Sequence, residues 1–223
     1  MIGSKTESKF MQLRQSFGIM KKANDGVAAI EFALVLPILV LIFFGLVESA
    51  NLLTADARLR AATAAAGDMI AQVDKVNIEQ NDLDDAWLGA QEIIKPIPIT
   101  FAGNPTFVIR VTVAKIRNNT TTIPLDVRWS RLLPNTSGST TSILGITNPV
   151  CGTLMTSLPT GLAPPDASTV EQTDIVESTG VYEWRPWFSV VFKLPISLKT
   201  VNYNIPRYRP QMPLSAAAGG NCI

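Results

Sequence analysis

Hydrophobic residues form one uninterrupted run near the start of the chain. Sixteen residues from Phe32 to Val47 carry no charge. Together with the five residues before them, they would form a helix about 30 Å long, close to the thickness of one hydrocarbon core. A helix in a soluble core would show a polar face at helical period, and this run shows none. The pattern therefore predicts a membrane-spanning helix over residues 27–47.

Beyond this run the pattern becomes amphipathic. Residues 48–76 are rich in helix-forming types and contain no proline, and their apolar positions recur at steps of three, four and seven. We expect the membrane helix to continue into this segment. A second helix is predicted at about Gln80–Lys95, with Asn81 or Asp82 as its cap, ending before Pro96.

Strand patterns follow the helices. Residues 106–117 alternate, and their apolar side chains on one face would be Phe107, Ile109, Val111 and Val113. Three further segments have strand character: Leu125–Leu133, Glu171–Trp184 and Lys199–Tyr208. The segment 134–168 is dense in Pro, Gly, Ser and Thr, which is typical of a long surface loop or insertion. The expected fold is α+β, with a long N-terminal helix packed on a small antiparallel sheet.

Charge divides the chain into an N-terminal leader and a body. Residues 1–26 carry five cations and two acids, while the rest of the chain holds 14 cations and 16 acids. A basic segment before an apolar run favours the cytoplasmic side of a membrane. A mildly acidic body lacks the clustered basic face that nucleic-acid binding needs. We therefore expect a single-pass protein with its N-terminus in the cytoplasm and no nucleic-acid partner.

These patterns predict four segments. They are a basic cytoplasmic leader (1–26), a transmembrane helix (27–47), an extracytoplasmic helical region (48–98) and a sheet domain (99–223) that contains the insertion at 134–168.

The N-terminus admits three interpretations. A cleaved signal peptide would need a small-x-small site, but Ala55-Asp56-Ala57 lies well beyond the apolar run. An uncleaved anchor fits the length and the flanking charges. The third interpretation rests on Glu31, because an acid inside an apolar membrane helix is costly and indicates a functional contact.

The segment Gly26–Phe32 reads Gly-Val-Ala-Ala-Ile-Glu-Phe and continues as Ala-Leu-Val-Leu-Pro-Ile-Leu. This stretch resembles the opening of TadE/TadF-like pseudopilins of Tad (Flp-type) pilus assembly, including the proline at Pro37. The resemblance implies that an aspartic prepilin peptidase cuts between Gly26 and Val27. Glu31 would then be the fifth residue of the mature chain, followed by Phe32. It also implies a pilin-like fold.

The family picture pairs the carboxylate of Glu31 with the N-terminal amine of a neighbouring subunit. Pro37 removes one backbone hydrogen bond and either bends the helix or is a tolerated irregularity.

The resemblance implies a structural role in pilus initiation or assembly in the bacterial inner membrane, with a periplasmic C-terminal domain; entry into the pilus itself is left open. Its partners would be the prepilin peptidase, other pilins or pseudopilins, the inner-membrane pilus platform and membrane lipid. The alternatives are an uncleaved, membrane-anchored extracytoplasmic scaffold, or an adhesin that binds through the insertion 134–168.

Weaker patches extend the resemblance along the chain. They are Arg128-Trp129-Ser130, the segment 181–186 and the basic segment 207–210. For the large aromatic residues of this half the alternatives are a binding surface and core packing, and we expect core packing because large aromatic side chains in a small domain are mostly structural. These residues are Trp129, Trp184, Trp187 and Phe188.

Nothing in the sequence indicates catalysis. The chain has no histidine, which removes the commonest general base and the commonest zinc ligand. It shows no phosphate-binding loop, nucleophile elbow or dinucleotide fingerprint. The acids Asp82, Asp84 and Asp85 are expected to lie at a helix start in water. We expect no enzymatic activity, no cofactor and no metal.

The two cysteines, Cys151 and Cys222, both fall in the predicted exported part. In an oxidising compartment they would most simply form one disulfide that closes a long loop. The alternative is two free thiols. Without a Cys-x-x-Cys motif, neither a metal site nor redox chemistry is indicated.

Overall fold

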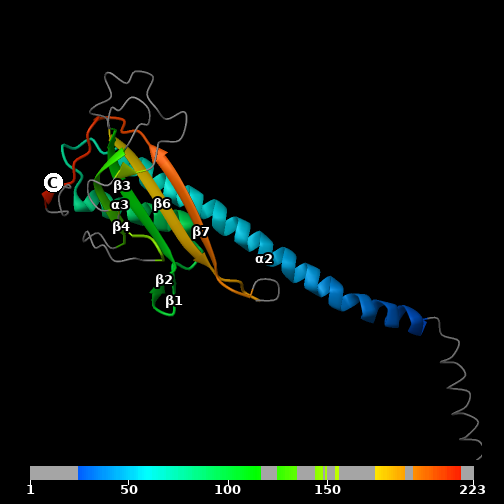
Figure 1. The fold of residues 1–223 in the computed structure, drawn as a ribbon. Helices are drawn as coiled ribbons and strands as arrows, with labels where there is room; N and C mark the ends of the chain where they lie inside the picture. The colour runs from blue at the N-terminus through cyan, green and yellow to red at the C-terminus, as the bar shows by residue number, and fades with distance from the viewer. Residues whose placement is uncertain are drawn as a thin grey trace, which may run out of the picture.

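The computed structural model describes residues 25–116, 125–134, 144–147, 149, 154–155, 174–188 and 193–216. Its largest element is helix α2 (Asp25–Ala71), whose 47 residues give a length of about 70 Å. Its C-terminal half packs on a small domain and its N-terminal half extends away from that domain (Figure 1). Residues 1–24 of the predicted leader lie outside the described residues.

Helix α2 ends at Ala71, earlier than the predicted helix, which ran to Val76. The last carbonyl of the helix accepts a hydrogen bond from the backbone N–H of Arg207 at 3.0 Å. A backbone group of the C-terminal segment therefore satisfies the end of the helix, which local sequence pattern does not reveal.

Helix α3 (Gln80–Ile94) agrees closely with the second predicted helix, but its predicted cap was wrong. The cap is Glu79, and Asp82 lies at the third helical position. The backbone N–H of Glu79 donates to Asp82 Oδ2 at 2.8 Å. Asp82 thus reaches back to the residue before the helix, as in a capping box.

Five strands form one antiparallel sheet in the order β5-β4-β3-β6-β7. Their bounds are β3 (Phe107–Ile116), β4 (Leu125–Leu133), β5 (Leu154–Met155), β6 (Asp174–Trp184) and β7 (Ile196–Asn204). A separate hairpin joins β1 (Thr100–Phe101) to β2 (Asn104–Pro105). The expected α+β fold, with a long helix on an antiparallel sheet, is confirmed.

Strand β7 differs most from its prediction. It begins at Ile196 and ends at Asn204, whereas the sequence pattern suggested residues 199–208. Its start is set by pairing, because Ile196 lies opposite Trp184, the last residue of β6. Beyond its end comes Pro206, which has no N–H to donate to a strand ladder.

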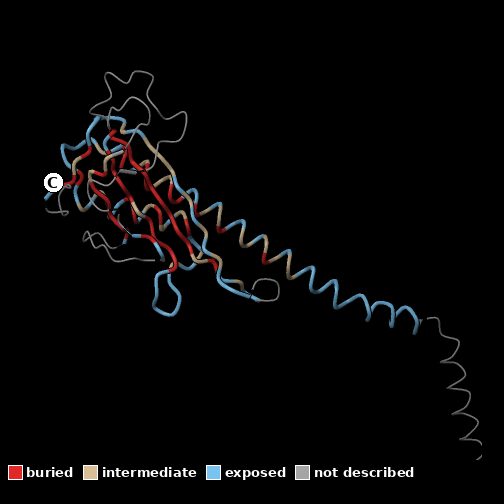
Figure 2. The backbone as a smooth tube through the Cα atoms, in the orientation of Figure 1, coloured by how far each residue is buried: buried red, intermediate tan, exposed pale blue. Residues whose placement is uncertain are grey.

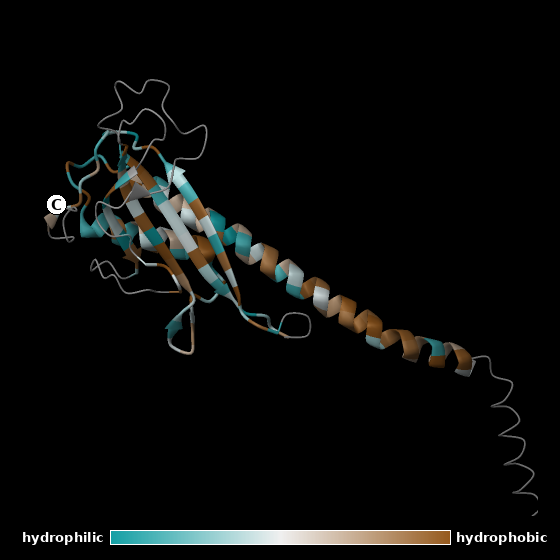
Figure 3. Ribbon diagram, in the orientation of Figure 1, coloured by the Kyte–Doolittle hydropathy of each residue, from teal (hydrophilic) through white to brown (hydrophobic). Residues whose placement is uncertain are grey.

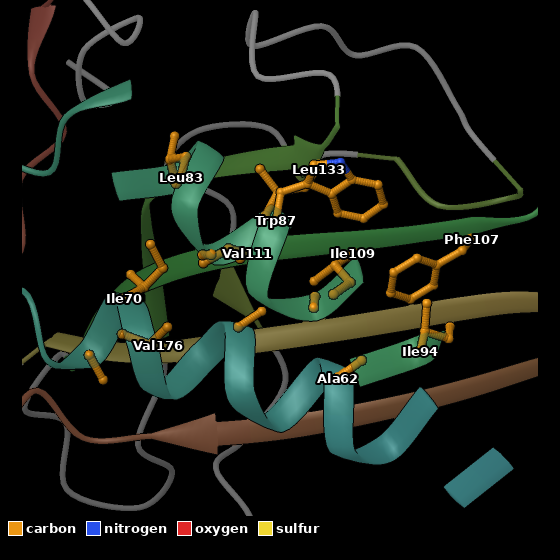
Figure 4. Packing of buried hydrophobic residues seen from close by; sticks show 14 of the residues in the cluster. Ala62, Ile70, Leu83, Trp87, Ile94, Phe107, Ile109, Val111, Leu133 and Val176 are labelled. Atoms are coloured by element: carbon orange, nitrogen blue, oxygen red, sulfur yellow. The ribbon is translucent and has the colours of Figure 1, made fainter. Parts of the chain in front are cut away.

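The core lies between the helices and one face of the sheet (Figures 2 and 4). The predicted inward face of β3 is confirmed, since all four of its apolar side chains belong to this core. Helix α2 contributes mainly small residues there, among them Ala55, Ala62 and Ala66. Small side chains let the helix axis approach the sheet closely, so the packed half of α2 is joined to the domain over several turns.

Two glycines also permit this close approach. A Cβ added at Gly180 of β6 would overlap the hydroxyl of Thr63, and one at Gly67 would lie 2.6 Å from Ser178 Oγ. Gly180 of β6 therefore faces α2, and Gly67 of α2 faces β6.

The aromatic residues divide into two pairs. Trp129 and Trp184 are buried as predicted, and Trp129 Nε1–H donates to the carbonyl of Met212 at 2.7 Å. For Trp187 and Phe188 the prediction was wrong, because they are 76% and 46% exposed. They lie in the connection that leads from β6 to β7.

Candidate functional site

The N-terminal half of α2 is the largest exposed apolar surface of the described chain. Every residue from 26 to 43 is exposed, and the most apolar window of the helix has a mean hydropathy of 2.8 and no buried residue. In Figure 3 the ribbon of this half is mostly brown, the colour of hydrophobic residues. Its length and composition suit a membrane anchor. Among the described residues, α2 is the one helix that is both long enough and apolar enough to cross a membrane.

The residues of the predicted cleavage site lie at the start of this exposed half. Gly26 and Val27 are both helical and exposed, and a Cβ at Gly26 would meet no atom within 4 Å. Glu31 follows Val27 by four residues, so the two lie on the same face, roughly 6 Å apart along the axis. Phe32 is 61% exposed beside them.

Glu31 makes no hydrogen bond or ion pair with any described part of the chain. Its carboxylate is exposed on a helix whose neighbouring side chains are apolar. The domain's own described residues thus leave this charge available to a group from another molecule.

Pro37 lies inside α2, and the helix continues through it. Proline lacks the N–H that would bond to the carbonyl of Ala33, so one rung of the helix is missing there. The position falls within the apolar half, where residues 26–43 are all exposed.

The outer end of the apolar run contains an acid that the sequence interpretation did not single out. Glu48 is completely buried, and its Oε1 accepts a hydrogen bond from the backbone N–H of Phe188 at 3.1 Å. One turn earlier, the ring of Phe44 packs against Phe188 with centroids 4.6 Å apart. The connection between β6 and β7 therefore folds onto α2 where the membrane run ends. The only sequence signal was that Glu48 is the first charge after the apolar run.

A pocket of about 390 Å³ opens next to this contact. It lies between α2 just beyond Glu48, the Pro96–Pro98 segment, β1 and the end of β6, and its lining is mostly apolar. The guanidinium of Arg185 lies 4.2 Å from the centre of the Phe101 ring at its rim. On its inner wall, burial raises the pKa of the Tyr182 phenol above its usual value, so this side chain remains neutral at physiological pH.

Within the described residues, no group of three or more acids or cysteines is placed to hold a metal ion. The pocket offers aromatic rings and cations, but its lining contains no nucleophile paired with a base. The acids Asp82, Asp84 and Asp85 begin α3, and Asp82 acts in its cap.

Both predicted disulfide partners, Cys151 and Cys222, lie outside the described residues, and so does most of the predicted insertion at 134–168. The disulfide therefore stays a prediction.

Comparison with known proteins locates one similarity. A family model described as TadE-like protein matches residues 26–68. The matched segment is the exposed half of α2 together with most of its packed half, and it covers the segment that suggested this family. The resemblance to TadE-like proteins is confirmed for this segment, and it indicates a Tad pilus-related protein. Neither the curated proteins nor the solved structures contain a significant match to the chain.

Proposed function

From this TadE-like helix, we propose that the chain is a membrane-anchored minor pseudopilin of a Tad-type pilus-assembly system. One observation carries the proposal: α2 is a single helix whose outer half is packed into a folded domain, while no described part of the chain buries its apolar inner half. A subunit of this shape can be held in a bilayer, and it can later exchange lipid for the apolar helices of neighbouring subunits.

The proposed orientation places the leader in the cytoplasm and the sheet domain in the periplasm. The cations of the leader favour this arrangement. A prepilin peptidase would then cut between Gly26 and Val27 on the cytoplasmic face. Gly26 supports this step, since it is exposed and nothing crowds its α-carbon.

Cleavage would create an ammonium group on Val27, one helical turn from Glu31. Two unit charges 4 Å apart attract by about 4 kcal/mol at an effective dielectric constant of 20. Removing the two charges from water costs a comparable amount. The pair between neighbouring subunits would therefore set their register more than it would add stability. Glu31 suits this role because it has no partner among the described residues.

Processing is tested by N-terminal sequencing and intact mass of the protein extracted from membranes of its native cell. We expect a chain that begins at Val27. The variant Gly26→Val should keep its leader and still fold, because the added side chain meets no atom of the domain. A native protein that still begins at Met1 or Ile2 would overturn the cleavage step and leave an uncleaved, anchored scaffold.

The assembly role is tested by Glu31→Gln, which keeps the shape of the side chain and removes its charge. We expect normal membrane insertion and cleavage but a loss of pili of about tenfold or more, since a buried amine would lose its partner. The matched control is Glu92→Gln on the exposed surface of α3, where the acid pairs only with Lys95. Equal piliation by the Glu31 variant and this control would show that the charge is incidental.

A further inference from the structure

The connection between β6 and β7 carries exposed apolar residues at the end of the domain that faces the membrane helix. We name its described residues, Arg185–Phe188 and Lys193–Pro195, the juxtamembrane loop. Trp187 is 76% exposed, Phe188 46% and Leu194 75%. Figure 1 shows this connection projecting from the sheet alongside α2, toward the apolar half of the helix.

Two contacts determine the position of the loop along the axis of α2. The Phe188 ring packs on Phe44, and its backbone N–H bonds to Glu48. Phe44 belongs to the apolar run and precedes the last residue of that run, Val47, by three positions. At 1.5 Å per residue, Phe44 therefore lies roughly 5 Å inside the outer boundary of the run. Because its ring contacts Phe44 and its backbone N–H bonds to Glu48, Phe188 lies within about one helical turn of this outer boundary.

The composition of the loop matches that of a membrane interface. Tryptophan prefers the headgroup level, where its ring meets apolar chains and its N–H meets water or ester groups. Lys193 is exposed on the limb that leads to β7, and long basic side chains reach from an apolar depth to phosphate. Phe188 and Leu194 supply the apolar part that would contact acyl chains.

We infer that the juxtamembrane loop inserts into the outer leaflet of the membrane that α2 crosses, with Trp187 at the headgroup boundary. The domain is then attached to the bilayer at two places, the helix and the loop, and its tilt relative to the membrane is set. The inference requires that α2 cross a membrane. It does not depend on cleavage after Gly26 or on pilus assembly.

The loop also explains why an acid can lie at this depth. Glu48 is fully buried, and the Phe188 N–H is one of its hydrogen-bond donors. A carboxylate facing acyl chains would be costly. The loop covers this carboxylate and presents its own apolar side chains outward in its place.

The test uses the fluorescence of Trp187 in the full chain, reconstituted in phosphatidylcholine vesicles with or without brominated acyl chains. The other three tryptophans, Trp87, Trp129 and Trp184, are at most 9% exposed, so the difference between wild type and Trp187→Phe reports Trp187. We expect bromolipid to reduce this difference signal about twofold or more, as for an interfacial tryptophan. Acrylamide in the water should quench it weakly.

The matched control is Tyr208→Trp in the Trp187→Phe background. Tyr208 is 64% exposed, and its neighbour Arg207 bonds to Ala71 at the far end of α2. It thus lies roughly 40 Å along the helix from Phe44. We expect acrylamide to quench this reporter strongly and bromolipid to leave it unchanged. Near-UV circular dichroism checks that each variant retains the native fold.

The inference is overturned if Trp187 behaves as the reporter of the Tyr208→Trp variant does, with strong acrylamide quenching and no effect of bromolipid. A second variant, Phe188→Ala, removes the ring that packs on Phe44 but leaves the core untouched. It should increase acrylamide quenching of Trp187 by about twofold because the loop loses part of its apolar anchor. Unchanged quenching in this variant would also count against insertion. If the loop inserts on a chain that keeps its leader, this inference stands while the proposed cleavage fails. This outcome distinguishes the inference from the proposed function.

Discussion

The two halves of α2 differ in what surrounds them although they form one continuous helix. The inner half, residues 26–43, is exposed at every position, whereas the outer half buries Leu59, Ala62 and Ala66 completely. The inner half is bulky and apolar on all sides. The outer half buries mainly small residues on one side, and its exposed side mixes polar residues such as Arg60 with apolar ones such as Leu53. The side chains of the outer half therefore fit one particular protein surface, the sheet. Those of the inner half require only an apolar environment.

The largest expected difference between the halves comes from removing one leucine from each. Leu59→Ala empties a fully buried site and should lower the free energy of unfolding by about 3–5 kcal/mol. Leu39→Ala, at a position that is 50% exposed, should leave domain stability within about 0.5 kcal/mol. Urea unfolding in detergent, followed by near-UV circular dichroism, measures both. Equal losses would mean that the inner half packs on the domain.

A single methyl group added to glycine gives the next largest contrast. Gly180→Ala places a Cβ against the Thr63 hydroxyl, so α2 must shift away from the sheet at a cost of about 1–3 kcal/mol. Gly26→Ala has open space and should not change stability. The same unfolding measurement applies. A stable Gly180→Ala variant would show that helix and sheet are less closely joined than their glycines indicate.

The smallest expected effect is a pH dependence of stability, and it follows from comparing an acid of the inner half of α2 with an acid of the sheet. Glu31 has no partner in the described chain, whereas Asp174 is buried, accepts the Met212 N–H at 2.6 Å and bonds to Arg128 at 3.0 Å. Burial nevertheless raises the pKa of Asp174 above its ordinary value of 3.8, with these two donors opposing the rise.

An acid whose pKa is raised by folding binds its proton more tightly in the folded state. Its protonation therefore stabilises the domain fully below the unfolded value, and that stabilisation is lost as pH rises through the folded value. Asp174→Asn lacks this dependence. We expect the stability advantage of wild type over the variant to be larger near pH 3 than near pH 7. Unfolding of the pair across this range measures it, and an advantage that grows with pH would contradict the raised pKa.

Local patterns predicted most of the fold. The alternation in β3 identified its core face, and the bounds of β4 and α3 agree with the structure to within one residue. These elements follow periods of two and 3.6 residues, which a short window of sequence contains. The apolar run and the Gly26–Phe32 motif likewise needed no distant contact to be recognised.

The failures share a different cause. The start of β7 depends on pairing with β6, and the end of α2 depends on a hydrogen bond from Arg207. The exposure of Trp187 and the burial of Glu48 depend on where the β6–β7 connection meets the helix. Each involves residues far apart in the chain, which a local pattern does not reveal, and hydrophobicity alone assigned Trp187 to the core.

The sequence by itself determined that an apolar, bilayer-length helix leads an α+β domain and bears one acid near its start, because these properties depend on composition and period along a single segment. Only the tertiary structure decided that the inner half of this helix stays free of the domain, and that a loop 140 residues away covers Glu48 at its outer end. The physical reason is that burial is a property of pairs of surfaces, and which surfaces meet is settled only when the sheet and helix pack together.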